Sequence, residues 1–130
     1  MIRKIDIKLA TMIMMGLLSF FVVFHLLILS GVVPYSIVWG GRLQNVTQMY
    51  VFEAVSLTIN LVVIAVVGIK GGYIKPYLPD KLVTFLLWVF VILFALNTVG
   101  NLFAESKLEQ ILFAPLTLIS TVLFYRMAIE

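Results

Sequence analysis

The chain has 130 residues, of which 63% are hydrophobic and only 12% are charged, and its mean hydropathy is +1.18. Soluble domains average about 45–50% apolar and about 25% charged residues, so this composition excludes a soluble globular domain. It also excludes a disordered chain, which needs low hydrophobicity. The absence of cysteine excludes a disulfide-stabilised secreted module. We therefore expect a single integral membrane domain over residues 1–130.

Four long apolar stretches are the main feature of the sequence. A hydrocarbon core about 30 Å thick needs about 20 mostly apolar residues to cross as a helix. Residues 9–29, 47–69, 82–103 and 108–125 meet this requirement. Helices satisfy every backbone amide within their own segment, whereas barrel strands alternate polar and apolar residues, and residues 61–67 do not alternate. The pattern predicts an all-α fold, a four-helix transmembrane bundle.

The basic residues are distributed unevenly between the connections. Loops on the cytoplasmic side of a membrane carry an excess of Lys and Arg. One side of the predicted bundle carries only Arg42 and Lys107. The other side, which includes both termini, carries seven basic residues: Arg3, Lys4, Lys8, Lys70, Lys75, Lys81 and Arg126. The bias predicts a multi-pass protein of the plasma (inner) membrane with both termini cytoplasmic, and attraction to anionic lipid. No basic face points to a nucleic-acid partner.

The connection over residues 30–46 differs from the other two. It is long, largely apolar and rich in glycine, with Pro34 near its start and Trp39 near its middle. One interpretation is an anchor in the outer interface, with Trp39 at the level of the headgroups. The alternative is that the segment forms a lid or wall of an external binding site. Both interpretations place the connection on the outer side.

Polar side chains lie at membrane depth, where ionisable groups are costly and often mark function. Glu53 is predicted about 9 Å inside the second helix, and Asn60 follows seven residues later. The third helix carries three polar residues spaced by four, and the only histidine lies near the outer end of the first helix. The candidate ligand-binding residues are His25, Arg42, Glu53, Asn60, Asn97, Asn101 and Glu105.

Five of these residues are predicted at similar depths in the outer part of the membrane: His25, Glu53, Asn97, Asn101 and Glu105. Asn60 lies deeper, and Arg42 is placed to cap the group from above. This agreement in depth favours a shared cavity that opens outward. The structural alternative is that they hydrogen-bond one helix to another, a contribution of about 0.6–2 kcal/mol each. Glu105 is close enough to a connection to be a solvated helix end. Glu53 is the residue for which a functional role is favoured, because it is the deepest ionisable group.

Several chemistries are excluded by the residue types. One histidine and no cysteine rule out a bis-His haem, an iron–sulfur cluster and the usual zinc sites within one chain. The sequence has no phosphate-binding loop and no dinucleotide glycine motif. We therefore expect no metal and no cofactor. Acid–base chemistry by Glu53 and His25 requires that the two lie within hydrogen-bond reach.

The leading functional hypothesis is a small polytopic protein, in contact with the lipid bilayer, that binds or transports a small amphipathic or lipid-like ligand in an outward-facing polar cavity. A second hypothesis is an accessory or structural subunit that docks to a larger membrane partner. A third is an intramembrane acid–base enzyme such as an isomerase, which is favoured less than a protein without catalytic activity. Assembly as a homo-oligomer is compatible with all three.

Overall fold

The computed structural model describes residues 2–38, 42–104 and 106–130, and all regular structure in these ranges is helical. The four long helical segments begin and end within three residues of the predicted limits. The elements are η1 (Ile2–Lys4), α1 (Ile7–Leu29), η2 (Tyr35–Ile37), α2 (Val46–Lys70), α3 (Asp80–Leu102), the π-helical turn η4 (Glu109–Phe113) and α4 (Ala114–Ala128).

The helix limits follow from local capping interactions. The side chain of Asp6 accepts a hydrogen bond from the backbone N–H of Lys8 at 3.2 Å, at the start of α1. Asn45 does the same for Gln48 at 2.9 Å, at the start of α2. Such side chains satisfy amides that have no partner within the first helical turn. After α2, Gly72 adopts a left-handed conformation with φ of 80°, which ends the helix.

All four helical segments are long and apolar enough to cross a membrane. α1 and α3 have 23 residues each, α2 has 25, and η4 with α4 has 20. At 1.5 Å per residue, even the shortest reaches about the 30 Å of a hydrocarbon core. Large apolar side chains such as Phe85, Ile92 and Leu96 are more than half exposed on α3. The helices therefore indicate a multi-pass membrane protein.

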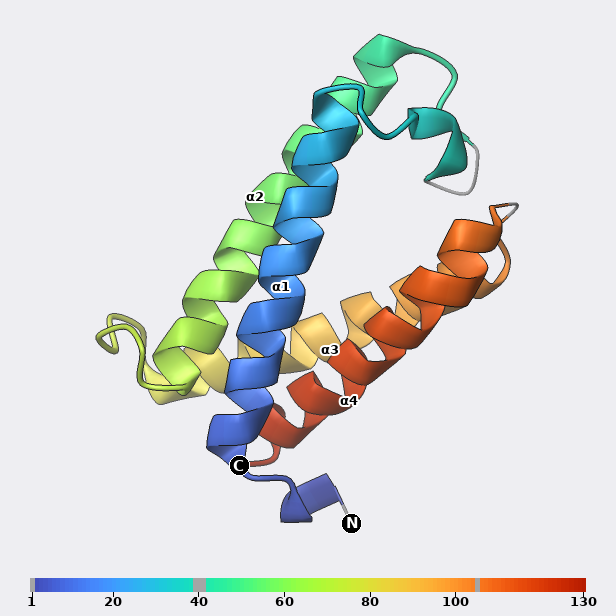
Figure 1. The fold of residues 1–130 in the computed structure, drawn as a ribbon. Coiled ribbons are helices and arrows are strands. Elements are labelled where there is room, and N and C mark those ends of the chain that lie inside the picture. The colour runs from blue at the N-terminus through green and yellow to red at the C-terminus, as the bar shows by residue number, and fades with distance from the viewer. Residues whose placement is uncertain (1, 39–41, 105) are drawn as a thin grey trace.

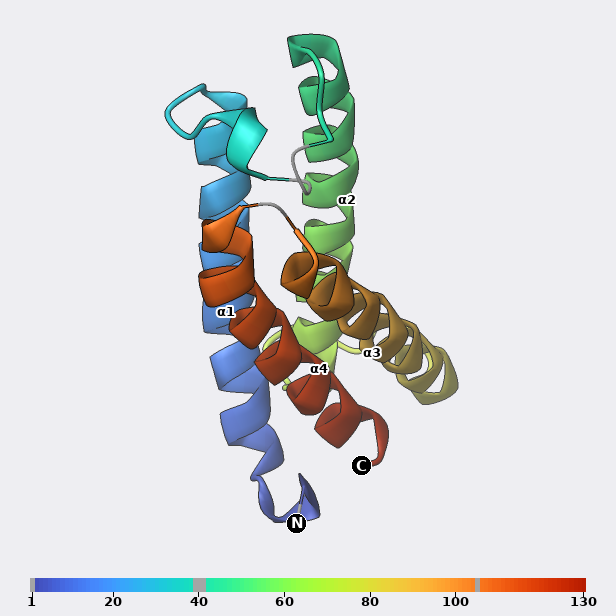
Figure 2. The ribbon, with the colours of Figure 1, turned by 90° about the vertical axis from the view of Figure 1, so that its right-hand side faces the viewer.

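The helices form two antiparallel pairs, α1 with α2 and α3 with α4 (Figure 1). The pairs converge at the end of the bundle where both chain termini lie, and they diverge toward the other end (Figures 1 and 2). At the convergent end, Nε of Arg126 donates a 2.6 Å hydrogen bond to the carbonyl oxygen of Ile5. This contact joins the first and last parts of the chain.

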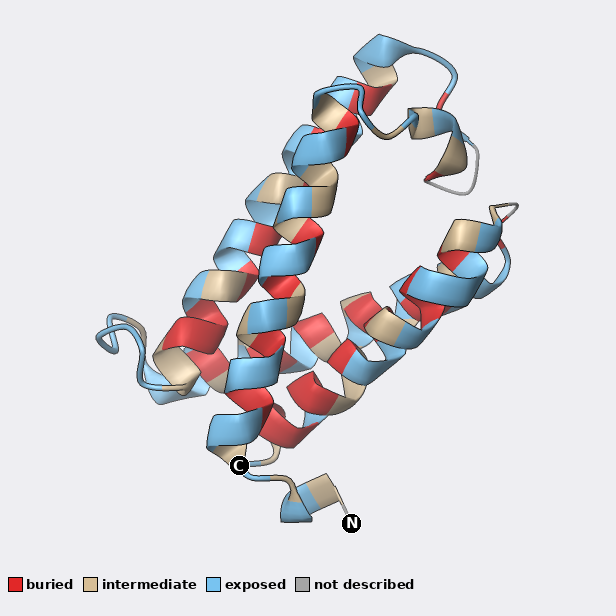
Figure 3. Cartoon of the chain, viewed as in Figure 1, coloured by how far each residue is buried: buried red, intermediate tan, exposed pale blue. Residues whose placement is uncertain are grey.

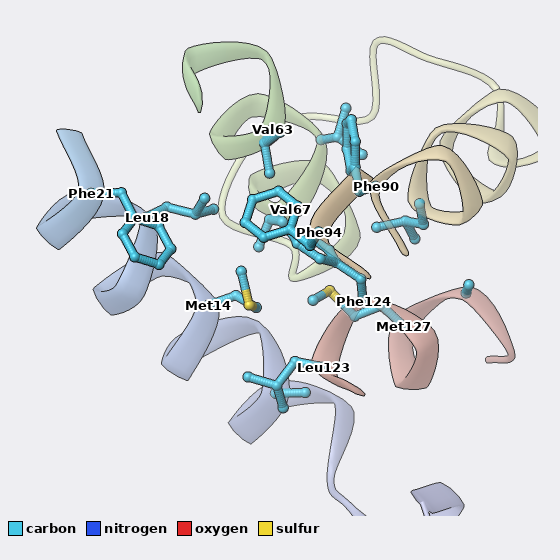
Figure 4. Packing of buried hydrophobic residues seen from close by; sticks show 14 of the residues in the cluster. Met14, Leu18, Phe21, Val63, Val67, Phe90, Phe94, Leu123, Phe124 and Met127 are labelled. Atoms are coloured by element: carbon cyan, nitrogen blue, oxygen red, sulfur yellow. The ribbon is translucent and has the colours of Figure 1, made fainter. Parts of the chain in front are cut away.

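The hydrophobic core occupies the convergent end, where buried residues of both pairs face one another (Figure 3). The ring of Phe124 on α4 lies 4.8 Å from the ring of Phe94 and 5.5 Å from that of Phe90, both on α3. The core side chains labelled in Figure 4 come from all four helices: Met14, Leu18, Phe21, Val63, Val67, Phe90, Phe94, Leu123, Phe124 and Met127. This core holds the pairs together at one end only.

The connection over residues 30–46 folds back over the divergent ends of α1 and α2. Val38 and Leu43 from this connection are buried with Ile28 of α1 and Met49 of α2 in a second, smaller cluster. The predicted interfacial anchor, Trp39, lies outside the described residues. The described part of the connection is thus packed against the helices.

The fourth transmembrane segment begins with a wide turn. Proline lacks an N–H group, and within an α-helix its ring collides with the carbonyl group four residues earlier. Pro115 follows directly after η4, in which the backbone N–H of Ala114 donates to the carbonyl oxygen of Glu109, five residues back. The sequence predicts a kink at Pro115, and the structure shows this π-helical turn just before the proline.

Candidate functional site

A cavity of about 510 Å³ lies between the divergent halves of the two helix pairs. It is lined by residues of all four helices, of η4 and of the connection between α1 and α2. Small-molecule sites in proteins usually measure about 300–1,000 Å³ and combine an apolar lining with a few polar groups. The volume of the cavity falls within this range. Its lining combines phenylalanine rings with carboxyl groups, carboxamides and one imidazole.

Six of the seven predicted site residues line this one cavity. The seventh, Glu105, lies outside the described residues. The six are His25 from α1, Arg42 from the connection, Glu53 and Asn60 from α2, and Asn97 and Asn101 from α3. Val38 also lines the cavity, so the connection contributes two residues to its wall. The described part of the connection thus contributes to the cavity wall.

The central polar contact joins α1 to α2. Nδ1 of His25 is hydrogen-bonded to Oε2 of Glu53. The side chain of Glu53 is fully buried, whereas that of His25 is 20% exposed. This contact meets the distance condition for acid–base chemistry between the two groups.

The three asparagines differ in their hydrogen bonds. Nδ2 of Asn60 donates to the carbonyl oxygen of Ser56 at 2.9 Å, a bond within α2, and Asn60 is buried. Asn97 is exposed and Asn101 is half-buried on α3. Within the described ranges, neither the Asn97 nor the Asn101 side chain makes a hydrogen bond to another residue. These two carboxamides are therefore available to a ligand.

Glu109 is a cavity residue that sequence reasoning missed. It is the first residue of η4, it is 6% exposed, and it lines the cavity. Glu109 was not among the residues predicted to bind a ligand. Thr117 on α4 is buried and also lines the cavity, but the π-helical turn between the two residues interrupts the regular period that would place them on one helix face.

Aromatic rings line the cavity between α1 and η4, and a hydroxyl pair joins α3 to α4 nearby. The rings of Phe24 and Phe113 have centroids 4.6 Å apart, and those of Phe21 and Phe113 have centroids 6.4 Å apart. Deeper in the bundle, the hydroxyl groups of Thr98 on α3 and Thr117 on α4 are hydrogen-bonded at 2.9 Å. These contacts fix the position of η4 and α4 at the cavity wall.

Comparison with family models, with curated protein sequences and with solved structures found no match for this chain. The described residues contain no group of three or more His, Cys, Asp or Glu side chains that would hold a metal ion. The site is therefore defined by its own geometry. It is a cavity of ligand size, with an apolar lining and several polar groups, between two helix pairs of a multi-pass helical protein.

Proposed function

We propose that this protein binds a small amphipathic ligand in the cavity between its helix pairs, as a membrane-bound binding protein or small transporter. The observation that carries the proposal is that His25, Glu53, Asn97 and Asn101, from three different helices, line one cavity together with phenylalanine rings. Polar and ionisable groups at membrane depth are energetically costly, and those that are present often mark function. An amphipathic ligand matches both the polar and the aromatic lining.

The proposed membrane arrangement places both termini in the cytoplasm and the cavity in the outer half of a plasma or inner membrane. Support comes from the fold and the charges together. The convergent end carries both termini, and seven of the nine Lys and Arg residues belong to segments that meet at this end. Cysteines introduced singly at Ser36 and at Tyr77 test the arrangement in intact cells, because the sequence has no other cysteine. A membrane-impermeant maleimide is expected to label the first variant and not the second.

Ligand binding is tested with a fluorophore at the mouth of the cavity. Phe103 lines the cavity and is 84% exposed, so a Phe103→Cys variant carries a bimane label without loss of core packing. The probe is a fatty alcohol that bears a nitroxide quencher on its chain, added to the protein in phosphatidylcholine vesicles. We expect saturable quenching, and competition by unlabelled fatty alcohol.

Two further variants distinguish quenching by probe bound in the cavity from quenching by probe dissolved in the surrounding lipid. Asn101→Leu removes a carboxamide of the cavity and is expected to weaken the saturable quenching. Thr58→Leu replaces an exposed residue of α2 that does not line the cavity, and it is expected to leave the quenching unchanged. Quenching that rises linearly with probe and is equal in both variants would contradict the proposal.

A second candidate function is favoured by one contact. The hydrogen bond between His25 and Glu53 brings an acid–base pair to the cavity, as proton transfer to or from a membrane-dissolved substrate requires. A long-chain ketone in deuterated buffer tests this function, because removal and return of a proton beside the carbonyl group exchanges hydrogen for deuterium. Exchange by the wild type that is lost in Glu53→Gln, which is expected to keep its stability, would support an enzyme. Equal exchange with and without the protein would contradict it.

A further inference from the structure

The cavity has an opening between α2 and α3, where its lining side chains are partly exposed. Val55 and Ile59 of α2 and Leu96 of α3 line the cavity and yet are 53%, 39% and 65% exposed. A side chain that both lines a cavity and faces outward marks an edge of its opening. α2 and α3 also pack against each other less extensively than α1 and α4 do. The opening between α2 and α3 thus has apolar edges, at a depth where the surroundings are hydrocarbon.

The polar groups nearest to this opening lie on the same helix as one of its edges. Asn97 and Asn101 are one helical turn apart on α3, and both line the cavity. Their carboxamides make no hydrogen bond to other residues in the described part of the chain. A carboxamide in an apolar setting is stabilised by a hydrogen-bonding partner. A polar head group placed just inside the opening meets both carboxamides.

The cavity has no excess of acidic or basic groups. The described lining residues include two carboxyl groups, Glu53 and Glu109, and two basic groups, Arg42 and His25. These equal numbers favour neither an anionic nor a cationic ligand. The two carboxamides, which both donate and accept hydrogen bonds, suit an uncharged head group such as a hydroxyl or a carbonyl.

Gly100 leaves the opening free of side-chain atoms on α3. It lines the cavity one turn beyond Leu96, on the same helix face. A Cβ atom built at Gly100 meets no atom within 4 Å, so the space beside it is open. A larger residue at this position fits without a clash and fills the space through which a ligand would pass.

From these observations we infer that the opening between α2 and α3 is a lateral portal for an uncharged, single-chain amphiphile from the membrane. The head group hydrogen-bonds Asn97 and Asn101, and the hydrocarbon chain lies between the apolar edges formed by Val55, Ile59 and Leu96. This inference rests on the proposed function, to which it adds the route of access and the chemical class of the ligand.

The route is tested by narrowing the portal in the bimane-labelled protein. Gly100→Phe is expected to slow association of the nitroxide-bearing fatty alcohol by about tenfold or more. Gly16→Phe is the matched control, because Gly16 is an exposed helical glycine whose Cβ position is also open and which does not line the cavity. Its association rate should equal that of the parent, and equal melting temperatures of the two variants show that both are folded.

The ligand class is tested with three nitroxide-bearing probes that share one chain: the fatty alcohol, the fatty acid and the fatty amine. Tightest binding of the alcohol supports the inference, and tightest binding of the acid or the amine overturns the assigned head group. An unchanged rate in Gly100→Phe, with normal binding by the parent, overturns the portal alone. Absence of saturable binding for all three probes overturns the proposed function and the portal with it.

Discussion

The imidazole of His25 on α1 and the fully buried carboxyl group of Glu53 on α2 are hydrogen-bonded at the edge of the cavity. The contact joins two residues that lie 28 positions apart in the sequence and come from facing helices. It gives the single ionisable group buried deep in α2 a partner, and the outer side of that partner faces the space proposed to hold a ligand. Its energetics therefore distinguish a binding site from a structural contact.

Substitution of the buried carboxyl group should cost little stability. In Glu53→Gln the amide keeps the size of the side chain and can still accept from Nδ1 of His25, while the desolvation of a charge is removed. We expect a melting temperature in detergent that is equal to or above that of the wild type. Functional residues are often maintained at some expense of stability. Unfolding of Glu53→Gln would show that the carboxylate serves mainly as a structural link.

Removal of the histidine should have the larger effect. His25→Ala leaves Glu53 buried without its imidazole partner, and breaking a buried pair in this way typically costs about 3–5 kcal/mol. Adding Glu53→Gln to His25→Ala should recover part of the lost stability, since the buried group is then uncharged. Chemical denaturation of the wild type, the two single variants and the double variant measures the coupling free energy between the two residues. Additive effects of the two substitutions would contradict this account.

Substitution of the Asn101 carboxamide should not lower the free energy of unfolding, whereas substitution of the Thr98–Thr117 hydroxyl pair should lower it. Asn101→Leu breaks no hydrogen bond to another described residue, so its free energy of unfolding should equal or exceed that of the wild type. Thr98→Val and Thr117→Val each remove a buried bond between α3 and α4, and a double-mutant cycle should give about 0.6 kcal/mol and at most about 1.7. A large loss of stability in Asn101→Leu would place that residue among the structural contacts.

Substitution by alanine should affect the free energy of unfolding differently at two glycines. Gly72 has φ of 80°, a conformation that residues with a Cβ rarely adopt, so Gly72→Ala should lower the free energy of unfolding by about 1 kcal/mol. Gly16 lies inside α1 with open space around it, so Gly16→Ala should be neutral or stabilising. Thermal unfolding of both variants in one detergent measures the difference. Equal effects would show that the end of α2 is not fixed as described.

The contact at the C-terminal end should depend on pH. The hydrogen bond and the positive charge of Arg126 lower the pKa of Glu130 below its ordinary value of 4.5. Because the pKa is lowered on folding, the stabilisation is present above the ordinary value and is lost as pH falls through the pKa of the folded state. Glu130→Gln should therefore melt below the wild type near pH 7. The two proteins should melt alike once Glu130 is protonated in both states, and a difference that persists in acid would contradict the assignment.

The helices and most of the polar residues that line the cavity could be predicted because the bilayer imposes strict requirements. A span must be apolar over about 20 residues, and a residue such as Glu53 inside it stands out for that reason. The similar depth of Asn97, Asn101 and His25 followed from helix geometry alone. The same reasoning placed both termini at one end of the bundle, where the structure has them.

Three features depend on packing that a helical pattern does not encode. The divergence of the two helix pairs follows from where the large core side chains gather, among them Phe94 and Phe124 at the convergent end. Glu109 faces the cavity from the π-helical turn before Pro115, and a regular 3.6-residue period does not anticipate such a turn. Val38 lines the cavity wall because the described part of the connection between α1 and α2 packs against these two helices.

The central claim, that the cavity binds an amphiphile, is tested most directly by comparing two bimane positions. A label at Phe103→Cys lies at the cavity, whereas a label at Met12→Cys lies on an exposed part of α1 outside it. In phosphatidylcholine vesicles, the nitroxide-bearing fatty alcohol should quench the first label saturably, and unlabelled fatty alcohol should reverse this. The second label should show only linear quenching by probe dissolved in the lipid. Linear, irreversible quenching of equal slope at both positions would contradict the claim.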